Sequence, residues 1–360
     1  MDIGIDVRKI GDTGIGRYIE NLVERLLVVD DRHRYTLFFA RGEAEAYPFP
    51  TSRVRKVTID APKYSLKEQT AFSDVGARFG IDIFHAPHFT LPFFLDVPSV
   101  VTIHDIIHLQ DKGQSPMVRT YARLVISSAL RRATLALTVS EASRQAILEY
   151  FLVEGERVRV THNGCGDFSR LSSKAINHCL AERSLSPGYL LFVGSDRPHK
   201  NIRAVYEVAA RTPDSLRIVV VGRVEDKSPF KEFGDRIVFT GPMEKDDLAC
   251  LYSGAACLLM PSFYEGFGLP PLEAMSCGTA VVSSNTTSLP EVCGDAALYA
   301  DPHDYATMAQ QVMTFIEQKD IRERFVQRGY EQAKRFSWDE TARKTLAAYE
   351  EVQRRNGIRR

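Results

Sequence analysis

The chain has 360 residues, which is too long for one ordinary hydrophobic core and fits two domains. Lysine plus arginine and aspartate plus glutamate each number 46, so the net charge is zero and argues against a nucleic-acid partner. Hydrophobic residues make up 44% of the chain, as in globular proteins, and no apolar stretch approaches the length of about 18 residues that spans a membrane.

The first residues, 1–7, lack the basic start of a secretion signal and predict a β-strand. A Gly-rich segment, residues 11–16, follows and leads into apolar residues at helical spacing. Gly14, Ile15 and Gly16 would let the backbone approach a diphosphate, and the alternative is a plain tight turn. Their spacing is not the dinucleotide Gly-x-Gly-x-x-Gly, which disfavours an NAD site.

Strand-like and helical patterns alternate through the rest of the first half. The strands are expected at residues 35–39, 54–59, 81–85, 99–103 and 135–139, and the helices at residues 66–79, 117–132 and 141–150. This alternation predicts a parallel, doubly wound sheet, whose ligands bind beyond the carboxyl ends of the strands.

Histidines lie at two of these strand ends. His85 and His88 belong to one, and His104 follows the next. A single histidine is more often a hydrogen-bonded structural residue than a catalyst, and for His85 and His88 we favour the structural role.

The second half begins after a polar, irregular segment, residues 167–187, which predicts the linker between two domains. Alternation restarts with a strand at residues 189–194, followed by Arg197 and Lys200 and then a helix at 202–211. Two fixed cations just after a strand could neutralise a departing diphosphate. The alternative is a solvated basic turn.

Six cysteines lie in the chain without any Cys-x-x-Cys pair, and several are in apolar runs. We therefore expect Cys165, Cys179, Cys250, Cys257, Cys277 and Cys293 to be reduced core residues and expect no zinc site.

Residues 261–278 carry the strongest chemical pattern. They lie between two apolar runs that read as buried strands, so they predict a strand-to-helix turn. Pro270 and Pro271 suit a first helical turn and Gly278 a helix end, which gives a short helix over residues 270–277. The free amides before this helix would bind an anion such as phosphate. This anion site would comprise Gly266, Phe267, Gly268 and Leu269.

Two glutamates bracket these glycines. Glu265 precedes the expected helix and Glu273 lies in its expected first turn, so both carboxylates can face one pocket. Carboxylates accept hydrogen bonds from hydroxyls, and a pair beside a phosphate site suggests a nucleotide sugar. The alternative is that Glu273 only complements the helix dipole and Glu265 is solvated.

The string Glu-Gly-Phe-Gly-Leu-Pro-Pro-Leu-Glu-Ala-Met-Ser-Cys-Gly at residues 265–278 resembles the donor-site motif of the family 4 retaining glycosyltransferases. The Gly-rich loop, the His-Asp pair at 104–105 and the Gly-to-Lys-Asn loop at 194–201 stand in the family's order, so the resemblance covers essentially the whole chain. It implies two Rossmann-like domains facing across a cleft, the GT-B arrangement.

The resemblance implies roles for the candidate side chains. Glu265 would bind hydroxyls of the donor sugar, Glu273 the ribose, and His104 would lie beside the sugar. Lys200 and Arg197 would stabilise the departing phosphate, which takes the acceptor's proton in a reaction without a protein nucleophile.

The resemblance also implies backbone contacts with the donor, and it contains one departure. The Gly-rich loop would form a wall of the diphosphate site, and the loop at residues 238–241 would lie near the nucleobase. These contacts would come from Gly14, Ile15, Gly16, Gly194, Val238, Phe239 and Thr240. Many members place an arginine directly after the glycine at 194, where this chain has Ser195, so we expect Arg197 to substitute.

We therefore expect an α/β protein of two domains. Residues 1–170 would form the acceptor side, with a C-terminal helix of about residues 338–360 packing back on it, and residues 188–337 would bind the donor. The predicted activity is retaining hexosyl transfer to a saccharide or lipid-linked saccharide. A nucleotide-sugar 2-epimerase and a non-catalytic sugar-nucleotide-binding protein are the alternatives.

The start of the chain also suggests a donor. Ile-Gly-Ile-Asp-Val-Arg with Gly-Ile-Gly-Arg-Tyr looks like the subgroup containing many mannosyltransferases of surface polysaccharide pathways, which makes GDP-mannose the leading donor and UDP-glucose the next. No Asp-x-Asp motif ends a strand, so we expect no metal and no cofactor.

One helical pattern bears on the membrane. The predicted helix at 117–132 has an apolar stretch flanked by arginines that could contact an anionic leaflet, namely Arg119, Arg123, Arg131 and Arg132. Because the net charge is zero, we favour an ordinary amphipathic helix with its apolar face in the core. We expect a cytoplasmic protein with at most weak peripheral contact at the inner face of the membrane.

Overall fold

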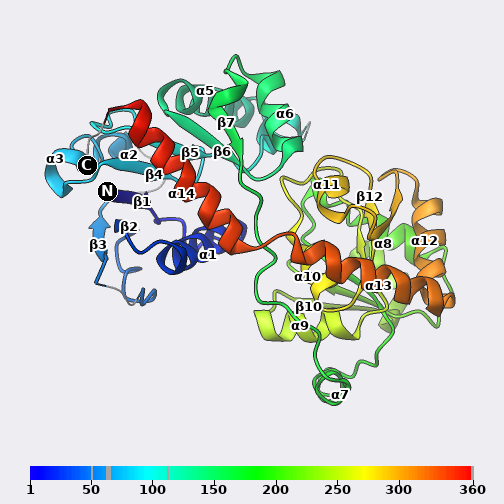
Figure 1. Ribbon diagram of the computed structural model, residues 1–360. Coiled ribbons are helices and arrows are strands. Elements are labelled where there is room, and N and C mark those ends of the chain that lie inside the picture. Colours follow the sequence, from blue (N-terminus) through cyan, green and yellow to red (C-terminus); the bar gives the residue numbers. More distant parts are fainter. Residues whose placement is uncertain (50–51, 62–65, 112, 358–360) are drawn as a thin grey trace. The chain divides into compact units, whose positions relative to one another are not determined.

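The computed structural model describes residues 1–49, 52–61, 66–111 and 113–357. The chain divides into two compact units, each a parallel sheet with helices (Figure 1). Unit 1 comprises Met1–Gly164 and Ser337–Arg360, and unit 2 comprises Cys165–Phe336. Residues 167–187, expected as a linker, therefore belong to unit 2. Residues 358–360 of the predicted C-terminal helix lie outside the described residues.

Within the described residues, unit 1 contains a seven-stranded parallel sheet of order β3-β2-β1-β4-β5-β6-β7. Its strands are β1 (Asp2–Asp6), β2 (Arg34–Ala40), β3 (Val54–Ile59), β4 (Ile83–Ala86), β5 (Ser99–Thr102), β6 (Leu135–Thr138) and β7 (Val158–Val160). The chain runs outward from β1 to β3 and then returns to place β4 beside β1. The topological switch point of this sheet therefore lies between β1 and β4.

The helices of unit 1 follow the predicted pattern with one interruption. They are α1 (Thr13–Val29), α2 (Leu66–Thr70), α3 (Val75–Phe79), α4 (Ile107–Gln110), α5 (Pro116–Arg132), α6 (Glu141–Tyr150), a 3₁₀ turn (Gly155–Arg157) and α14 (Trp338–Arg355). The single helix expected at residues 66–79 is two short helices. The C-terminal α14 packs on α1 within unit 1 (Figure 1).

Unit 2, all of whose residues are described, contains a six-stranded parallel sheet of order β10-β9-β8-β11-β12-β13. Its strands are β8 (Leu190–Val193), β9 (Ile218–Val221), β10 (Ile237–Gly241), β11 (Cys257–Met260), β12 (Ala280–Ser284) and β13 (Ala297–Ala300). Here the chain runs from β8 out to β10 and returns with β11 beside β8, so the switch point lies between β8 and β11.

The helices of unit 2 connect these strands. They are α7 (Ser173–Ala181), a 3₁₀ turn (Pro198–Lys200), α8 (Arg203–Ala209), a 3₁₀ segment (Ser228–Arg236), α9 (Lys245–Gly254), α10 (Leu269–Ser276), α11 (Leu289–Cys293), α12 (Tyr305–Glu317) and α13 (Lys319–Lys334). Parallel strands under helices are buried on both faces, which explains why β8, β9 and β11 are continuous apolar runs whose side chains are all buried except that of Val193.

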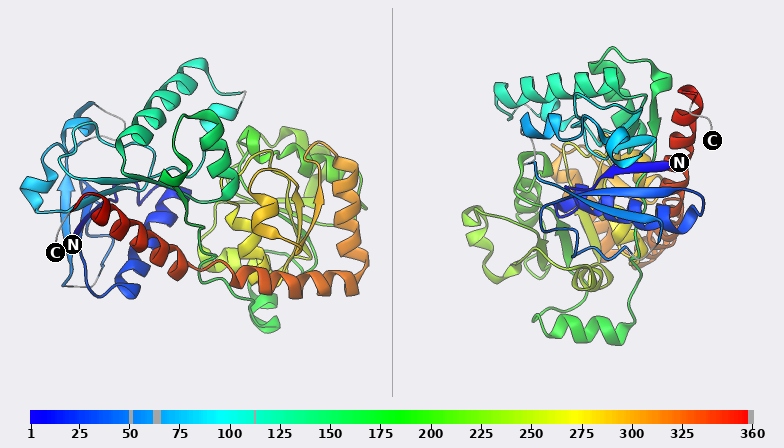
Figure 2. Two further views of the ribbon diagram at one scale, coloured as in Figure 1. Left: turned by 45° about the horizontal axis from the view of Figure 1, so that its top comes forward. Right: turned by 90° about the vertical axis from the view of Figure 1, so that its left-hand side faces the viewer.

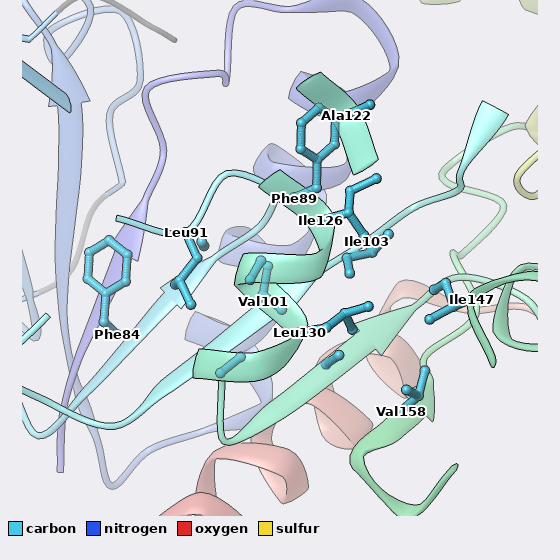
Figure 3. Close-up of a cluster of buried hydrophobic side chains, with 14 of the residues drawn as sticks. Phe84, Phe89, Leu91, Val101, Ile103, Ala122, Ile126, Leu130, Ile147 and Val158 are labelled. Carbon is cyan, nitrogen blue, oxygen red and sulfur yellow. The ribbon is translucent and has the colours of Figure 1, made fainter. Parts of the chain in front are cut away.

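One hydrophobic cluster in unit 1 contains side chains from β4, β5, α5 and α6 (Figure 3). Ala122, Ile126 and Leu130 lie on the face of α5 that points toward this cluster. A serine begins α5: Ser115 accepts a hydrogen bond from the amide of Val118, which satisfies one of the free donors of the first turn.

The cysteine prediction is wrong for two of the six residues. Cys179 of α7 and Cys250 of α9 form a disulfide, with Cα atoms 6.6 Å apart. The other four, Cys165, Cys257, Cys277 and Cys293, are free and buried, as expected. The two bonded residues are 71 positions apart, so their proximity depends on the packing of α7 on α9.

Candidate functional site

Candidate site residues of unit 2 gather at the carboxyl edge of its sheet, at the switch point. Lys200 follows β8 and Glu265 follows β11, and these two strands are neighbours. The Nζ atom of Lys200 donates to Oε1 of Glu265 at 2.7 Å and to Oε2 at 3.0 Å. The side chains are 21% and 10% exposed, respectively, so a ligand can reach the pair from solvent.

Hydroxyl groups hold the Glu265 segment in place. The Ser262 hydroxyl donates to Oε1 of Glu265 at 2.6 Å, and the Glu265 amide donates to the hydroxyl of Thr287 at 3.1 Å. Ser288 donates to the carbonyls of Glu265 and Phe267. The glutamate is therefore fixed at both its carboxylate and its backbone before any ligand binds.

Asn201 fixes the loop that carries Lys200. Its φ of 53° is left-handed, which asparagine tolerates better than most residues, and it ends the 3₁₀ turn. Its side-chain amide donates to the carbonyls of Pro261 and Pro302 at 3.0 and 2.9 Å. Asn201 was not predicted to have a role of its own, although its position directly after Lys200 was part of the motif.

The expected anion site lies where α10 begins. Gly268 caps the helix with a φ of 103°, and a Cβ there would lie 2.8 Å from the side chain of Leu289. Pro270 and Pro271 occupy the first turn, as predicted, so the amides near Gly268 and Leu269 open the helix. Gly266 and Phe267 precede this cap. The Phe267 side chain is 4% exposed, so it packs in the interior as well as forming part of the turn.

Glu273 lies differently from its prediction. It is in the second turn of α10, its side chain is buried, and its Oε2 accepts a hydrogen bond from the Tyr252 hydroxyl at 2.9 Å. The whole residue is 1% exposed, whereas Glu265 is part-buried beside solvent. The two carboxylates thus have different surroundings, because Glu273 lies on the side of α10 that faces α9.

Glycines end three adjacent strands of unit 2 on the same edge. Gly194, Gly222 and Gly241 lie at the ends of β8, β9 and β10. A Cβ on Gly222 would lie 2.0 Å from the carbonyl oxygen of Gly194, so only glycine fits there. Gly222 was not predicted as a residue of the site. The repeated strand-Gly pattern at 194, 222 and 241 was the available signal.

Residues expected near the nucleobase lie on the edge strand β10. Phe239 packs against Phe230 and lies under the Lys227 ammonium, and the Thr240 hydroxyl donates to the Gly241 carbonyl at 3.0 Å. Val238 pairs with Val219 of β9. Arg197, the expected substitute cation, is exposed at the start of the 3₁₀ turn, and within the described chain no ion pair of Arg197 is recorded.

Residues 13–16 of the Gly-rich segment in unit 1 form the first turn of α1, and residues 11–12 precede the helix. Gly14 is exposed, Ile15 half-buried and Gly16 buried. The Gly16 amide donates to the Asp12 carbonyl at 2.9 Å, so this N–H is already hydrogen-bonded within the turn, and a diphosphate contact of Gly16 stays a prediction. A Cβ on Gly16 would lie 2.1 Å from the carbonyl oxygen of Ile10, and this close packing explains the glycine. Gly14 and Ile15 remain as candidate donors.

His104 follows β5 at the carboxyl edge of the unit 1 sheet. Its Nε2 donates to the Pro87 carbonyl at 3.0 Å, and its ring meets Tyr18 edge-on at 4.6 Å. Burial lowers the pKa of His104, although the Pro87 bond and Asp105 oppose the shift. The ring is therefore neutral, and Nδ1 is its acceptor.

The other two histidines are structural, as favoured from the sequence. His85 is fully buried, with Nδ1 bonded to the Tyr349 hydroxyl of α14 at 2.6 Å and Nε2 to the Thr102 hydroxyl at 2.8 Å. Burial, with His104 as a second cause, lowers the pKa of His85 to about 3. His88 is also buried, and burial lowers its pKa well below the usual value.

A buried ion network after β1 was missed by sequence reasoning. Arg8 donates to Asp6 and to Glu68, both at 2.6 Å, and it donates to the Ala61 carbonyl at 3.3 Å. Its guanidinium also lies 4.8 Å from the centre of the Phe72 ring. Glu68 is 60 residues from Arg8, so no local pattern could pair them.

The described part of the chain contains neither a membrane-spanning helix nor a cluster of metal ligands. No helix there is both long and apolar enough to cross a bilayer. Among the same residues, no three or more His, Cys, Asp or Glu side chains gather as they would around a metal ion.

Two protein families match the chain in sequence. Residues 13–165 match the family described as Glycosyltransferase Family 4, and residues 182–332 match the family described as Glycosyl transferases group 1. The first match lies in unit 1 apart from its last residue, and the second lies inside unit 2.

Relatives of known name cover most of the chain. The O-antigen chain mannosyltransferase B of Escherichia coli is 33% identical, over 94% of this chain and 96% of its own length. The O-antigen chain mannosyltransferase RfbU of Salmonella typhimurium is 28% identical over 66% of each chain.

Solved structures show the same fold. Sucrose-phosphate synthase from Thermosynechococcus elongatus superposes with a TM-score of 0.80 at 20% identity, over 98% of this chain and 99% of that one. Anabaena HepE in complex with UDP and glucose gives 0.78 at 19% identity, over 98% and 100% of the two chains. With two parallel-sheet units, the family matches and a relative similar over nearly its full length, this chain belongs to the family 4 glycosyltransferases and has the GT-B fold.

Proposed function

We propose that this chain transfers mannose from GDP-mannose to a saccharide or lipid-linked saccharide, with retention at the anomeric carbon. The observation that carries the proposal is the Lys200–Glu265 pair beside the amides that open α10. A nucleotide sugar needs a cation and amides for its diphosphate and a carboxylate for its hydroxyls. The mannosyl assignment and the acceptor class follow the names of the E. coli and Salmonella relatives.

The Lys200–Glu265 pair suggests an order of events. Without donor, the Lys200 ammonium binds both carboxylate oxygens of Glu265. An arriving diphosphate competes for that ammonium, since it carries more charge than the carboxylate. Glu265 then has acceptor capacity for the sugar hydroxyls, while the Ser262 hydroxyl keeps the carboxylate in place.

The chemical step places growing negative charge on the departing phosphate. Lys200, Arg197 and the amides at Gly268 and Leu269 stabilise this charge more strongly in the transition state than in the bound donor. The phosphate takes the proton of the acceptor hydroxyl, which attacks from the face that the phosphate leaves. No side chain acts as a nucleophile in this scheme.

Residues outside the ion pair have supporting roles in the proposal. Glu273 accepts from the ribose, with Tyr252 holding its other oxygen. Gly14 and Ile15 of α1 contact the diphosphate, and the neutral His104 lies beside the donor sugar. Val238, Phe239 and Thr240 lie near the nucleobase, and Gly194 contributes to the donor loop that carries Lys200. The side chains supply the positive charge, so we expect no metal requirement and no cofactor.

The test is to measure release of nucleoside diphosphate from GDP-mannose and UDP-glucose, with and without saccharide acceptors, in the presence of EDTA. We expect acceptor-dependent release of GDP and an α-configured product from an α-configured donor, read by NMR. Inversion of the donor sugar without an acceptor would instead identify the epimerase, and binding without turnover would identify a sensor. The curated relatives favour neither alternative.

A further inference from the structure

Among the described residues, three other than glycine have a left-handed backbone, namely Ser184, Asn201 and Thr287, with φ of 55°, 53° and 52°. Two of the three lie beside the Lys200–Glu265 pair. Asn201 directly follows Lys200, and the Thr287 hydroxyl accepts a hydrogen bond from the Glu265 amide at 3.1 Å. Asparagine tolerates this conformation, but the β-branched side chain of threonine is strained in it. A strained residue persists only where the surrounding structure fixes it, so the surroundings of Thr287 matter.

Thr287 belongs to a run of hydroxyl side chains that begins at the end of β12, the gold strand of unit 2 that pairs with β11 (Figure 2). We define the hydroxyl clamp as four of these residues, Ser284, Thr286, Thr287 and Ser288. All four bond to the backbone of residues 262–267, the segment that follows β11 and carries Glu265. Three of them donate to carbonyls: Ser284 to Ser262 at 2.6 Å, Thr286 to Ser262 at 3.2 Å, and Ser288 to Phe267 at 2.8 Å. The clamp therefore joins the ends of two neighbouring strands.

Thr287 differs from the rest of the clamp in two respects. Its hydroxyl accepts from an amide, whereas the other three donate to carbonyls, and the residue is exposed, whereas Ser284 and Ser288 are buried. Burial in the core therefore does not account for a threonine at this position. Glycine would adopt a φ of 52° without strain, but it has no hydroxyl to accept from the Glu265 amide. The hydroxyl is thus the property that threonine adds here.

We propose that Thr287 is a positioning residue, which acts through the Glu265 amide to hold the Glu265 carboxylate toward the donor sugar. The inference rests on the proposed function, in which the arriving diphosphate draws the Lys200 ammonium away from that carboxylate. Glu265 then keeps two fixed points, the Ser262 hydroxyl at its Oε1 and the Thr287 hydroxyl at its amide. A catalytic group that shifts by about 1 Å loses much of its effect on the transition state, so the second fixed point matters for turnover.

The test compares two substitutions at Thr287 with a matched control. Thr287→Ser keeps the hydroxyl, Thr287→Gly removes both the hydroxyl and the strain, and Ser184→Gly removes the same kind of strain ahead of the amino end of β8. With GDP-mannose and a saccharide acceptor, Thr287→Gly should lower kcat about tenfold, whereas Thr287→Ser should stay within about twofold and Ser184→Gly should be unchanged. GDP affinity in calorimetric titration should change little in all three, because GDP carries no sugar. The thermal midpoint should also change little, because both positions are exposed.

A second measurement needs neither donor nor acceptor. Hydrogen exchange at the Glu265 amide, followed by NMR, should be about tenfold faster in Thr287→Gly than in the unchanged protein and nearly unchanged in Thr287→Ser. Normal kcat or normal exchange in Thr287→Gly, or an equal loss of kcat in Thr287→Ser or Ser184→Gly, would overturn this inference alone. If the unchanged protein released no GDP with saccharide acceptors present, the proposed function would fail instead, and the amide exchange would still decide whether Thr287 holds Glu265.

Discussion

Each of the two sheets has a topological switch point with charged side chains near it. The ion pairs of the two units differ in how far their side chains are exposed to solvent. In unit 2, Lys200 and Glu265 have side chains 21% and 10% exposed. In unit 1, the side chains of Arg8 and Glu68 are each 2% exposed, and Asp6 is 10% exposed. An ion pair near a switch point is therefore not by itself a ligand site.

The difference lies in which partners a ligand can replace. Arg8 is held by two carboxylates, the Ala61 carbonyl and the face of Phe72, and solvent does not reach it. Lys200 has one carboxylate partner, and its side chain is 21% exposed. A diphosphate can displace the second arrangement but not the first, so we expect the unit 2 pair to control turnover and the unit 1 network to control stability.

The largest expected effect comes from breaking the unit 2 pair. Lys200→Ala and Glu265→Gln should each lower kcat by about 10²–10³-fold, because each removes charge or acceptor capacity used in the transition state. Their thermal midpoints should change little, since the pair is partly exposed. Steady-state kinetics and calorimetry would measure both quantities.

Lys319→Ala and Glu317→Gln serve as matched controls, because both residues are exposed on helices of unit 2 away from its carboxyl edge. The controls should keep the unchanged kcat. A Lys200→Ala or Glu265→Gln variant with near-normal kcat would remove this pair from the proposed site.

Breaking the unit 1 network should give the opposite pattern. Arg8→Met leaves Asp6 and Glu68 as buried carboxylates without their cation, which should cost about 3–5 kcal/mol of unfolding free energy. Arg8→Lys keeps the charge but not the bidentate hydrogen-bond geometry, so it should lose less unfolding free energy than Arg8→Met. Urea unfolding followed by far-ultraviolet circular dichroism would measure it. A stable Arg8→Met protein would show that the network does not hold β1 to α2.

Glu273 offers a sharper comparison inside unit 2. Glu273→Gln should weaken GDP binding about tenfold with a smaller effect on kcat, because a ribose contact is similar in the ground and transition states. Tyr252→Phe removes only the partner of Oε2 and is the matched control. Calorimetric titration with GDP would compare them, and an unchanged GDP affinity in Glu273→Gln would assign the residue to packing alone.

The smallest expected effect is the pH dependence of unit 1. Folding lowers the pKa of His85 to about 3, so below the unfolded pKa the unfolded chain binds a proton that the folded chain does not. Stability from this residue is complete above about pH 6.5 and falls as the pH drops toward 3. Between pH 7.5 and 5.5 the expected loss is about 1 kcal/mol.

His85→Gln can still bond Tyr349 and Thr102 but does not titrate, so it should lose less stability over this pH interval than the unchanged protein. Urea unfolding at the two pH values tests the difference. An identical pH dependence in both proteins would show that His85 is not a source of acid sensitivity.

Sequence patterns predicted the alternation of elements and the candidate residues of the unit 2 site. Buried parallel strands are continuous apolar runs, and helix ends carry proline and glycine, so β8, β11 and α10 could be located within a residue or two. Lys200 and Glu265 could be proposed because each lies in the segment that follows such a strand. Local spacing places both residues at one edge of the sheet, since the carboxyl ends of parallel strands share it, and the family resemblance supplied their proposed roles.

Tertiary structure decided which groups face solvent and which partners meet. The burial of Glu273 beside Tyr252, the Arg8–Glu68 bond and the Cys179–Cys250 disulfide all join residues 21 to 71 positions apart. On α5, residues 117, 121 and 124 and residues 122, 126 and 129 have equally helical spacing, and only packing on the sheet shows which set is buried. Periodicity describes one element at a time, whereas burial and pairing depend on its neighbours, which lie far away in the chain.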